Sequence, residues 1–248
     1  MVVVLVSQCA GMALLLLVAF FVNEPFPPVI DLLAAAVAGI LGTIGLVRFY
    51  QELAGGRMGI IAPSVAVVTV TIPVLFSAVT EGVPQTNEIA GILLAILAIW
   101  LITRSGNNKV PVTLRDMAVI LVIGAMFSAF LVTIGSVSER SVIWPLVASR
   151  SASIGMVILV LLFTGRWHAS VPRGQLPLIS LVGFLDVGGS AFYAVSSSLG
   201  RLDIAAVIAS LYPAVTVVLA RIILSEEIGN RQWLGIAIAL AAIVLITL

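Results

Sequence analysis

Long apolar blocks separated by short polar breaks decide what this chain can fold into. Hydrophobic residues make up 61% of its 248 residues and charged residues only 9%, whereas a soluble protein carries about 25% charged residues. A bilayer core about 30 Å thick needs about 20 mostly uncharged helical residues to cross it, so each block predicts a spanning helix. Nine blocks qualify, at Met1–Val22, Leu32–Tyr50, Met58–Thr80, Ile89–Thr103, Met117–Ser136, Val142–Phe163, Leu176–Ser196, Ile204–Leu224 and Trp233–Leu248.

The blocks predict helices because each one is continuously apolar. A membrane β-strand would instead alternate apolar and polar residues over about ten positions, and a helix pairs all its backbone amides within one segment. The first block has no Lys or Arg ahead of it, so a retained helix is expected rather than a cleaved signal peptide. The sequence therefore predicts an all-α membrane protein with about nine transmembrane helices.

Several classes of function are excluded by composition. The net charge of +1 argues against nucleic acid as a partner. Cys9 is the only cysteine and His168 the only histidine, which leaves no thiolate or imidazole set for a metal. The sequence has no Walker motif and no cluster of acid, base and nucleophile. We therefore expect no cofactor, no metal and no enzyme activity.

The second half of the chain repeats the first at a shift of 144 residues. Gly39 aligns with Gly183, Gly45 with Gly189, and Gly56-Arg57 with Gly200-Arg201, and self-similarity over such a long period marks a repeat architecture. Leu5 to Gln8 also resembles the stretch from Leu146 to Arg150, although more loosely. This predicts a first repeat at 1–104, a linking loop at 105–115 and a second repeat at 116–248.

The two repeats differ by one helix. The second holds five predicted helices and the first holds four, because the helix at Met117–Ser136 has no counterpart ahead of Met1. A late start, a truncated gene model or a nine-helix variant would each explain this, and truncation is the expected explanation. An odd number of helices in a complete repeat makes sequential repeats point opposite ways across the bilayer, which is typical of transporters.

The order and spacing of several motifs resemble EamA-type members of the drug/metabolite transporter superfamily. The second repeat carries Ser210-Leu211-Tyr212-Pro213, a Leu-x-Glu ending at Glu226, and Gly235 after Gln232-Trp233; the first carries Ala62-Pro63, Pro73 and a terminal Glu81. The resemblance covers almost the whole chain. It implies ten helices in two inverted five-helix repeats that move small metabolites or drugs without ATP, and the missing first helix is the departure from that pattern.

Polar residues inside the apolar blocks give the candidate site. Asp186 lies in the middle of its block, and Ser190, Tyr193 and Ser197 follow on the same helix face. An ionisable residue at the bilayer centre costs at least about 2.5–3.5 kcal/mol, so this face is expected to turn inward with Arg150 as the counter-ion. Two interpretations stay open, namely a substrate pathway and a static ion pair that joins two helices.

Other residues complete the candidate list. Prolines in corresponding helices of the two repeats suggest interrupted helices near a transporter's binding site. The expected substrate pathway contains Asp186, Ser190, Tyr193, Ser197, Arg150, Ser210, Tyr212, Pro213 and Pro63. The expected structural or boundary charges are Arg221, Glu226, Glu81, Arg48 and Glu52. Small residues at four-residue spacing, Gly91 with Ala95 and Gly235 with Ala239, predict close helix contacts within the chain.

These features together predict a secondary transporter in the plasma membrane, the inner membrane of a bacterium. It would export a small organic metabolite or drug-like molecule by alternating access within the lipid bilayer, with the proton as a candidate coupling ion. A truncated integral membrane protein that does not transport is the alternative, and an integral membrane enzyme is a more distant one.

Overall fold

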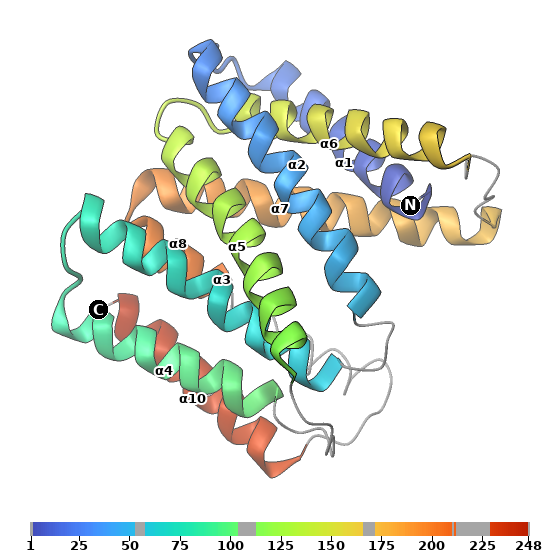
Figure 1. Ribbon diagram of the computed structural model, residues 1–248. Coiled ribbons are helices and arrows are strands. Elements are labelled where there is room, and N and C mark those ends of the chain that lie inside the picture. The colour runs from blue at the N-terminus through green and yellow to red at the C-terminus, as the bar shows by residue number, and fades with distance from the viewer. Residues whose placement is uncertain are drawn as a thin grey trace. The chain divides into compact units, whose positions relative to one another are not determined.

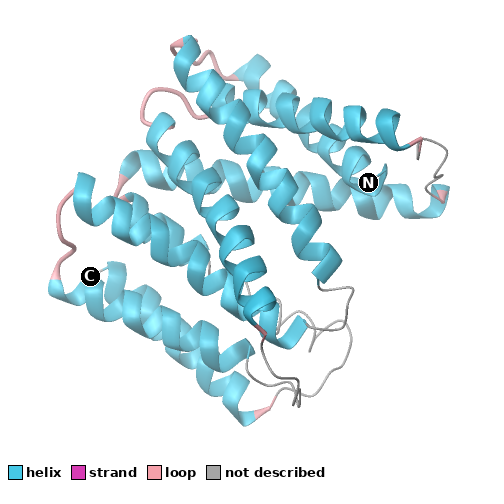
Figure 2. Cartoon of the chain, in the orientation of Figure 1, coloured by secondary structure: helices cyan, strands magenta, loops and turns pink. Residues whose placement is uncertain are grey.

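The computed structural model describes residues 2–52, 58–103, 113–165, 172–209, 211 and 229–247, and every regular element among them is helical (Figures 1 and 2). The α-helices are α1 (Val2–Phe21), α2 (Val29–Glu52), α3 (Met58–Thr80), α4 (Thr86–Thr103), α5 (Leu114–Val137), α6 (Ile143–Thr164), α7 (Leu176–Leu199), α8 (Leu202–Ala209) and α10 (Asn230–Thr247), with one short 3-10 helix, η3 (Arg173–Gln175). This confirms the predicted all-α membrane class.

The helices follow the predicted blocks in order. Among the described residues, α1, α2, α5, α6 and α7 are long and apolar enough to cross a membrane, and the shorter apolar stretches are Ser64–Thr80, Thr86–Leu101 and Trp233–Ala242. The predicted span Ile204–Leu224 begins in α8, but most of it lies outside the described residues.

The chain forms two compact units, and each takes residues from both halves of the sequence. The first unit contains Met1–Val47 and Ala129–Leu199, and the second contains Arg48–Ser128 and Gly200–Leu248. The interleaving follows from the packing, because helices of one repeat pair with helices of the other. In the second unit α4 packs on α10 and α3 on α8, while in the first unit α1 packs on α7 and α6.

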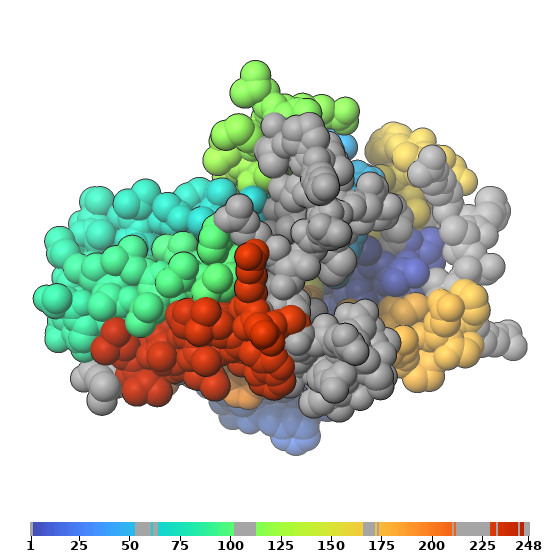
Figure 3. Space-filling view, turned by 90° about the horizontal axis from the view of Figure 1, so that it is seen from below, coloured from blue at the N-terminus to red at the C-terminus, as the bar shows by residue number. Residues whose placement is uncertain are grey.

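Small side chains let α4 and α10 approach closely in the second unit. Ala95 and Ala98 of α4 and Ala239 and Ala242 of α10 are all almost fully buried in one apolar cluster, and each alanine of α4 is 144 residues from one of α10. Figures 1 and 3 show the two helices side by side. The predicted close contact is confirmed for Ala95 and Ala239, and Ala98 and Ala242 extend it. Association of helices in lipid depends on such tight packing rather than on the hydrophobic effect.

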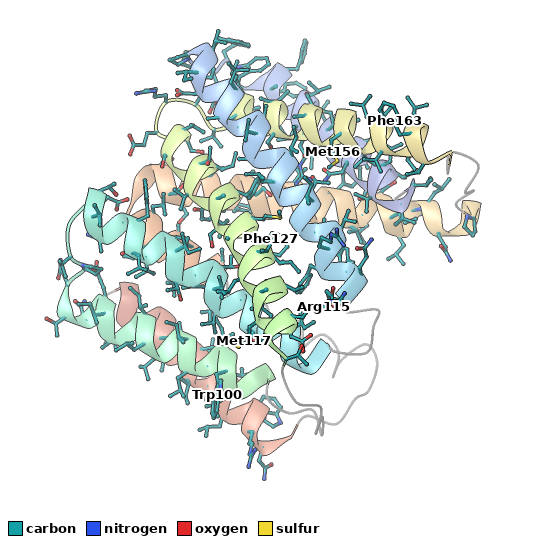
Figure 4. The ribbon with its side chains drawn as sticks, in the orientation of Figure 1. Trp100, Arg115, Met117, Phe127, Met156 and Phe163 are labelled. Carbon is teal, nitrogen blue, oxygen red and sulfur yellow. The ribbon has the colours of Figure 1, made fainter. Side chains whose placement is uncertain are left out.

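The second unit also contains an apolar pocket that lacks the groups expected of a polar substrate site. Its volume is about 460 Å³. The lining residues are Ser64, Val67, Val68, Trp100, Met117, Ile120 and Leu121, of which Trp100 and Met117 are labelled in Figure 4. None of these residues is charged, so the described part of the lining offers no charge to recognise a polar substrate.

Two glycines set the spacing of the helices in the first unit. A Cβ atom on Gly39 of α2 would overlap the main-chain oxygen of Ser149 in α6, and a Cβ atom on Gly183 of α7 would overlap the main-chain oxygen of Ser7 in α1. Gly39 and Gly183 are the aligned glycines of the two repeats. In one contact the glycine comes from the first repeat and the serine from the second, and in the other contact the reverse holds. An approximate twofold relation between the repeats produces such a pair of contacts.

We expect Gly183→Ala to destabilise the protein. The added methyl group meets the backbone of Ser7, which cannot move aside as a side chain would, and overpacking of this kind costs about 1–3 kcal/mol. Thermal unfolding in detergent measures the effect. Gly188→Ala in the same helix is the matched control, because its Cβ would meet nothing within 4 Å, and equal melting temperatures for the two variants would contradict the close contact.

A carboxylate from the α1–α2 connection caps α6. Glu24 accepts hydrogen bonds from the backbone N–H groups of Val142 and Ile143 and from the hydroxyl of Ser141, at 2.8–3.1 Å. These N–H groups have no partner within the helix, and negative charge is favoured at a helix N-terminus. Nearby, Arg140 pairs with Asp31 at 2.8 Å, and this hydrogen bond raises the pKa of Arg140.

Candidate functional site

Arg150 is the central residue of the candidate site. It lies in α6, seven residues after Ile143, which places it about 10 Å along the helix. The rest of α6 is apolar or small and uncharged, and the arginine side chain is only 10% exposed. A charge at this depth must be met by protein or water rather than by lipid.

Two other helices of the first unit supply the partners of the guanidinium group. The Nη1 group of Arg150 donates a hydrogen bond to the Oε1 atom of Gln8 in α1, and its Nη2 group lies 2.5 Å from the Oδ2 atom of Asp186 in α7. The structure thus brings Arg150 and Asp186 together, as the sequence predicted. The ion pair joins α6 to α7, and the amide of Gln8 fixes the arginine from the side of α1.

Exposure differs sharply between the two charges. The Asp186 side chain is 52% exposed, against 10% for Arg150, although Asp186 lies near the middle of α7. The uncovered part of a carboxylate within a membrane span cannot face hydrocarbon at low cost. It must therefore face water or another polar group.

Gln8 was missed by reasoning from the sequence, and the repeat explains its position. Ser7 and Ser149 each contact the aligned glycine of the other repeat, so they occupy equivalent positions. Gln8 and Arg150, which follow them, are therefore also equivalent, and they bond to each other. The loose alignment of the stretch ending at Gln8 with the one ending at Arg150 was the signal that could have found this contact.

The charges have neutral counterparts in the first repeat. At the 144-residue shift Asp186 corresponds to Gly42, which is covered by the ring of Phe130 from α5. Gln8 likewise stands where the second repeat has Arg150. Both charges of the site therefore come from the second repeat.

The polar face of α7 is divided along its length. Asp186 and Ser190 are exposed or partly exposed, and the Ser190 hydroxyl donates to the backbone oxygen of Asp186 at 2.9 Å. Tyr193 and Ser197 are each only 6% exposed, and the Tyr193 hydroxyl donates to the backbone oxygen of Leu131 in α5 at 2.8 Å. The four residues share a helix face, but only the half around Asp186 is open.

The remaining predicted residues fall in three places. Ser210, Tyr212, Pro213, Arg221, Glu226 and the side chain of Pro63 lie outside the described residues. Glu81 is exposed directly after α3. Arg48 and Glu52 lie one turn apart at the end of α2, with Arg48 exposed.

A second charged cluster lies in the second unit, at the start of α8. Arg201 forms two hydrogen bonds with the carboxylate of Asp203, at 3.0 and 3.1 Å, and donates to the backbone oxygen of Gly82 at 2.9 Å. Glu88 approaches the same guanidinium at 4.0 Å. The hydrogen bonds to Asp203 raise the pKa of Arg201. Asp203 is fully buried. Through Arg201, this cluster joins the turn after α3 to the start of α8.

Comparison with known proteins gives two matches of different kinds. A sequence model described as the EamA-like transporter family matches residues 116–248. A protein of known crystal structure is similar over 99% of this chain and 86% of its own chain, with a TM-score of 0.75 and 17% sequence identity, which shows a shared fold. No curated protein sequence matches the chain.

Proposed function

Because this chain belongs to the EamA-like transporter family, we infer that it is a secondary transporter that exports a small organic metabolite or drug-like molecule. Members of this family are membrane transporters, and the chain is a multi-pass integral membrane protein. The proposed location is the plasma membrane, the inner membrane of a bacterium.

One observation supports the position of the substrate pathway. Arg150 is buried within a span and held by Gln8, while its ionic partner Asp186 is half-exposed. A static pair that only joined two helices within a span would be expected to have both charges covered by protein, since a charge that faces hydrocarbon is costly. An open carboxylate beside a covered arginine instead suits a site that a polar solute reaches.

The proposed mechanism is alternating access. Inverted-repeat transporters place the substrate near the bilayer midplane and expose it to the two sides in turn as one repeat rocks against the other. Asp186 and Ser190 would line the open part of the pathway, and Arg150 would meet a polar group of the substrate. Pro63 and Pro213 remain proposed parts of the pathway on the grounds of the repeat, and Ser210 and Tyr212 on the grounds of the motif that resembles the family.

The test first identifies the exported molecule and then measures its flux through the purified protein. Comparing the metabolites in the medium of cells with and without the chain identifies candidates, which are then loaded into liposomes containing the purified protein. We expect Asp186→Asn and Arg150→Gln to remove most of the flux while the protein stays monodisperse.

Arg140→Gln is the matched control, because Arg140 is also paired to an aspartate but is 64% exposed in the turn between α5 and α6. It should retain the flux of the original protein. Unchanged flux in both site variants would exclude the proposed pathway.

A further inference from the structure

The arrangement of charges around Arg150 restricts what can bind there. One positive and one negative group stand in contact, and the positive group is the covered one. A ligand that reaches the pair from the open side meets the Asp186 carboxylate first. It can contact the guanidinium only after the contact between the Asp186 carboxylate and the Nη2 group breaks.

Charge balance then determines how an anion could enter. If a monoanion replaced Asp186 on Arg150 while Asp186 kept its charge, the site would hold a net negative charge within the membrane span, where unpaired charge is costly. A proton on Asp186 removes that charge. The carboxylate becomes neutral and releases Arg150, and the Nη2 N–H groups are left for the incoming anion.

We propose that this site binds one organic carboxylate together with one proton, the proton on Asp186 and the carboxylate on Arg150. The inference rests on the proposed transport function and adds the class of its substrate. The proton comes from the aqueous side that the site faces and returns to water when the anion leaves. Because the loaded state has the same net charge as the empty one, the transported pair is electroneutral.

The titratable residues of the surrounding helices indicate that Asp186 is the group that takes up the proton. In the described part of the first unit, α1 contains Cys9 as its single titratable residue and α6 contains Arg150 alone. Besides Asp186, α7 contains only Tyr193, whose hydroxyl donates to Leu131, and the portion of α5 from Ala129 to Val137 contains none. Cys9 is exposed. The part of α2 in this unit, which packs on α6, contains Asp31, and this carboxylate pairs with Arg140. The short helix η3, which packs on α7, begins with Arg173.

Proton uptake during ligand binding tests the proposal. The probes are acetate, lactate and benzoate, each compared with its primary amide, and calorimetry in buffers of different ionisation enthalpy counts the protons. For the original protein we expect a carboxylate to bind with uptake of one proton, so that its affinity falls as the pH rises. The amides should bind far more weakly.

Two variants separate the roles of the charges. Asp186→Asn, which is permanently neutral, should still bind the carboxylate but without proton uptake and without pH dependence. Arg150→Gln should lose carboxylate binding, whereas Arg150→Lys should retain part of it. Arg140→Gln serves as the control and should behave like the original protein.

The outcomes distinguish this inference from the proposed function. If the site variants abolish flux of the exported molecule but that molecule is neutral or cationic, or binds with no proton uptake, the carboxylate inference is overturned and transport through this site stands. Equal binding of carboxylates and amides would also overturn it. Unaltered flux in Asp186→Asn and Arg150→Gln would instead remove the transport function of the site itself.

Discussion

Replacing Asp186 with alanine is expected to lower the free energy of unfolding by about 3 kcal/mol, because it strands the guanidinium of Arg150 inside the helix bundle. Breaking a buried ion pair costs about 3–5 kcal/mol, and the half-exposed position of Asp186 places the effect at the low end of that range. The double variant Asp186→Ala, Arg150→Ala should recover a large part of the loss, since no buried charge remains.

A double-mutant cycle on unfolding in detergent measures this coupling. The single variants Asp186→Ala and Arg150→Ala and the double variant are compared with the original protein, and the coupling free energy is the departure from additivity. Strictly additive effects would show that the two charges do not pair in solution. Gln8→Ala should weaken the protein less, because it removes a neutral hydrogen-bond partner rather than a charge.

The second large effect is expected at Asp203. This carboxylate is fully buried and accepts hydrogen bonds from Arg201 and from the backbone N–H of Ile204. Among the described residues, Asp203→Ala leaves Arg201 with a hydrogen bond to the oxygen of Gly82 and with the charges of the more distant Glu88 and Glu81. We expect a loss of about 3–5 kcal/mol, measured as a fall in melting temperature.

Glu139→Ala is the matched control for Asp203. Glu139 is also an acidic residue beside a helix end, but it is exposed, and exposed substitutions usually change stability by less than about 0.5 kcal/mol. If the two alanine variants melt at the same temperature, the hydrogen bonds between Arg201 and Asp203 contribute nothing to stability.

The fold was largely predictable because its determinants are local. Apolar runs of the length needed to cross a bilayer specify helices without help from distant residues, so the predicted blocks and the observed helices agree in order. The resemblance to EamA-type transporters rested on motifs with fixed order and is confirmed by the family match over residues 116–248. Which helices pack together was harder to predict from the sequence. Ala95 and Ala239 nevertheless indicated one close helix contact correctly.

The site was only partly predictable because it depends on contacts between distant helices. The cost of burying an isolated charge was enough to pair Arg150 with Asp186. Helical spacing placed Tyr193 on the face of Asp186, but spacing cannot tell that α5 covers one end of this face and leaves the other open. Gln8 carries no charge and so gave no signal of its own, and only the repeat relation explains why it meets Arg150.

We propose that the uncovered half of the α7 polar face lines a water-filled substrate pathway. Cysteine labelling tests it most directly. With Cys9 first replaced by serine, Ser190→Cys and Phe192→Cys are exposed in membranes to a water-soluble thiol reagent. Phe192 is the control, since it is 80% exposed but points to the opposite side of α7, where lipid is expected.

We expect Ser190→Cys to react many times faster than Phe192→Cys, and we expect the exported molecule to slow the reaction at residue 190 alone. Equal labelling of the two positions, or a cysteine at residue 190 that does not react, would show that this face of α7 does not line a water-filled pathway.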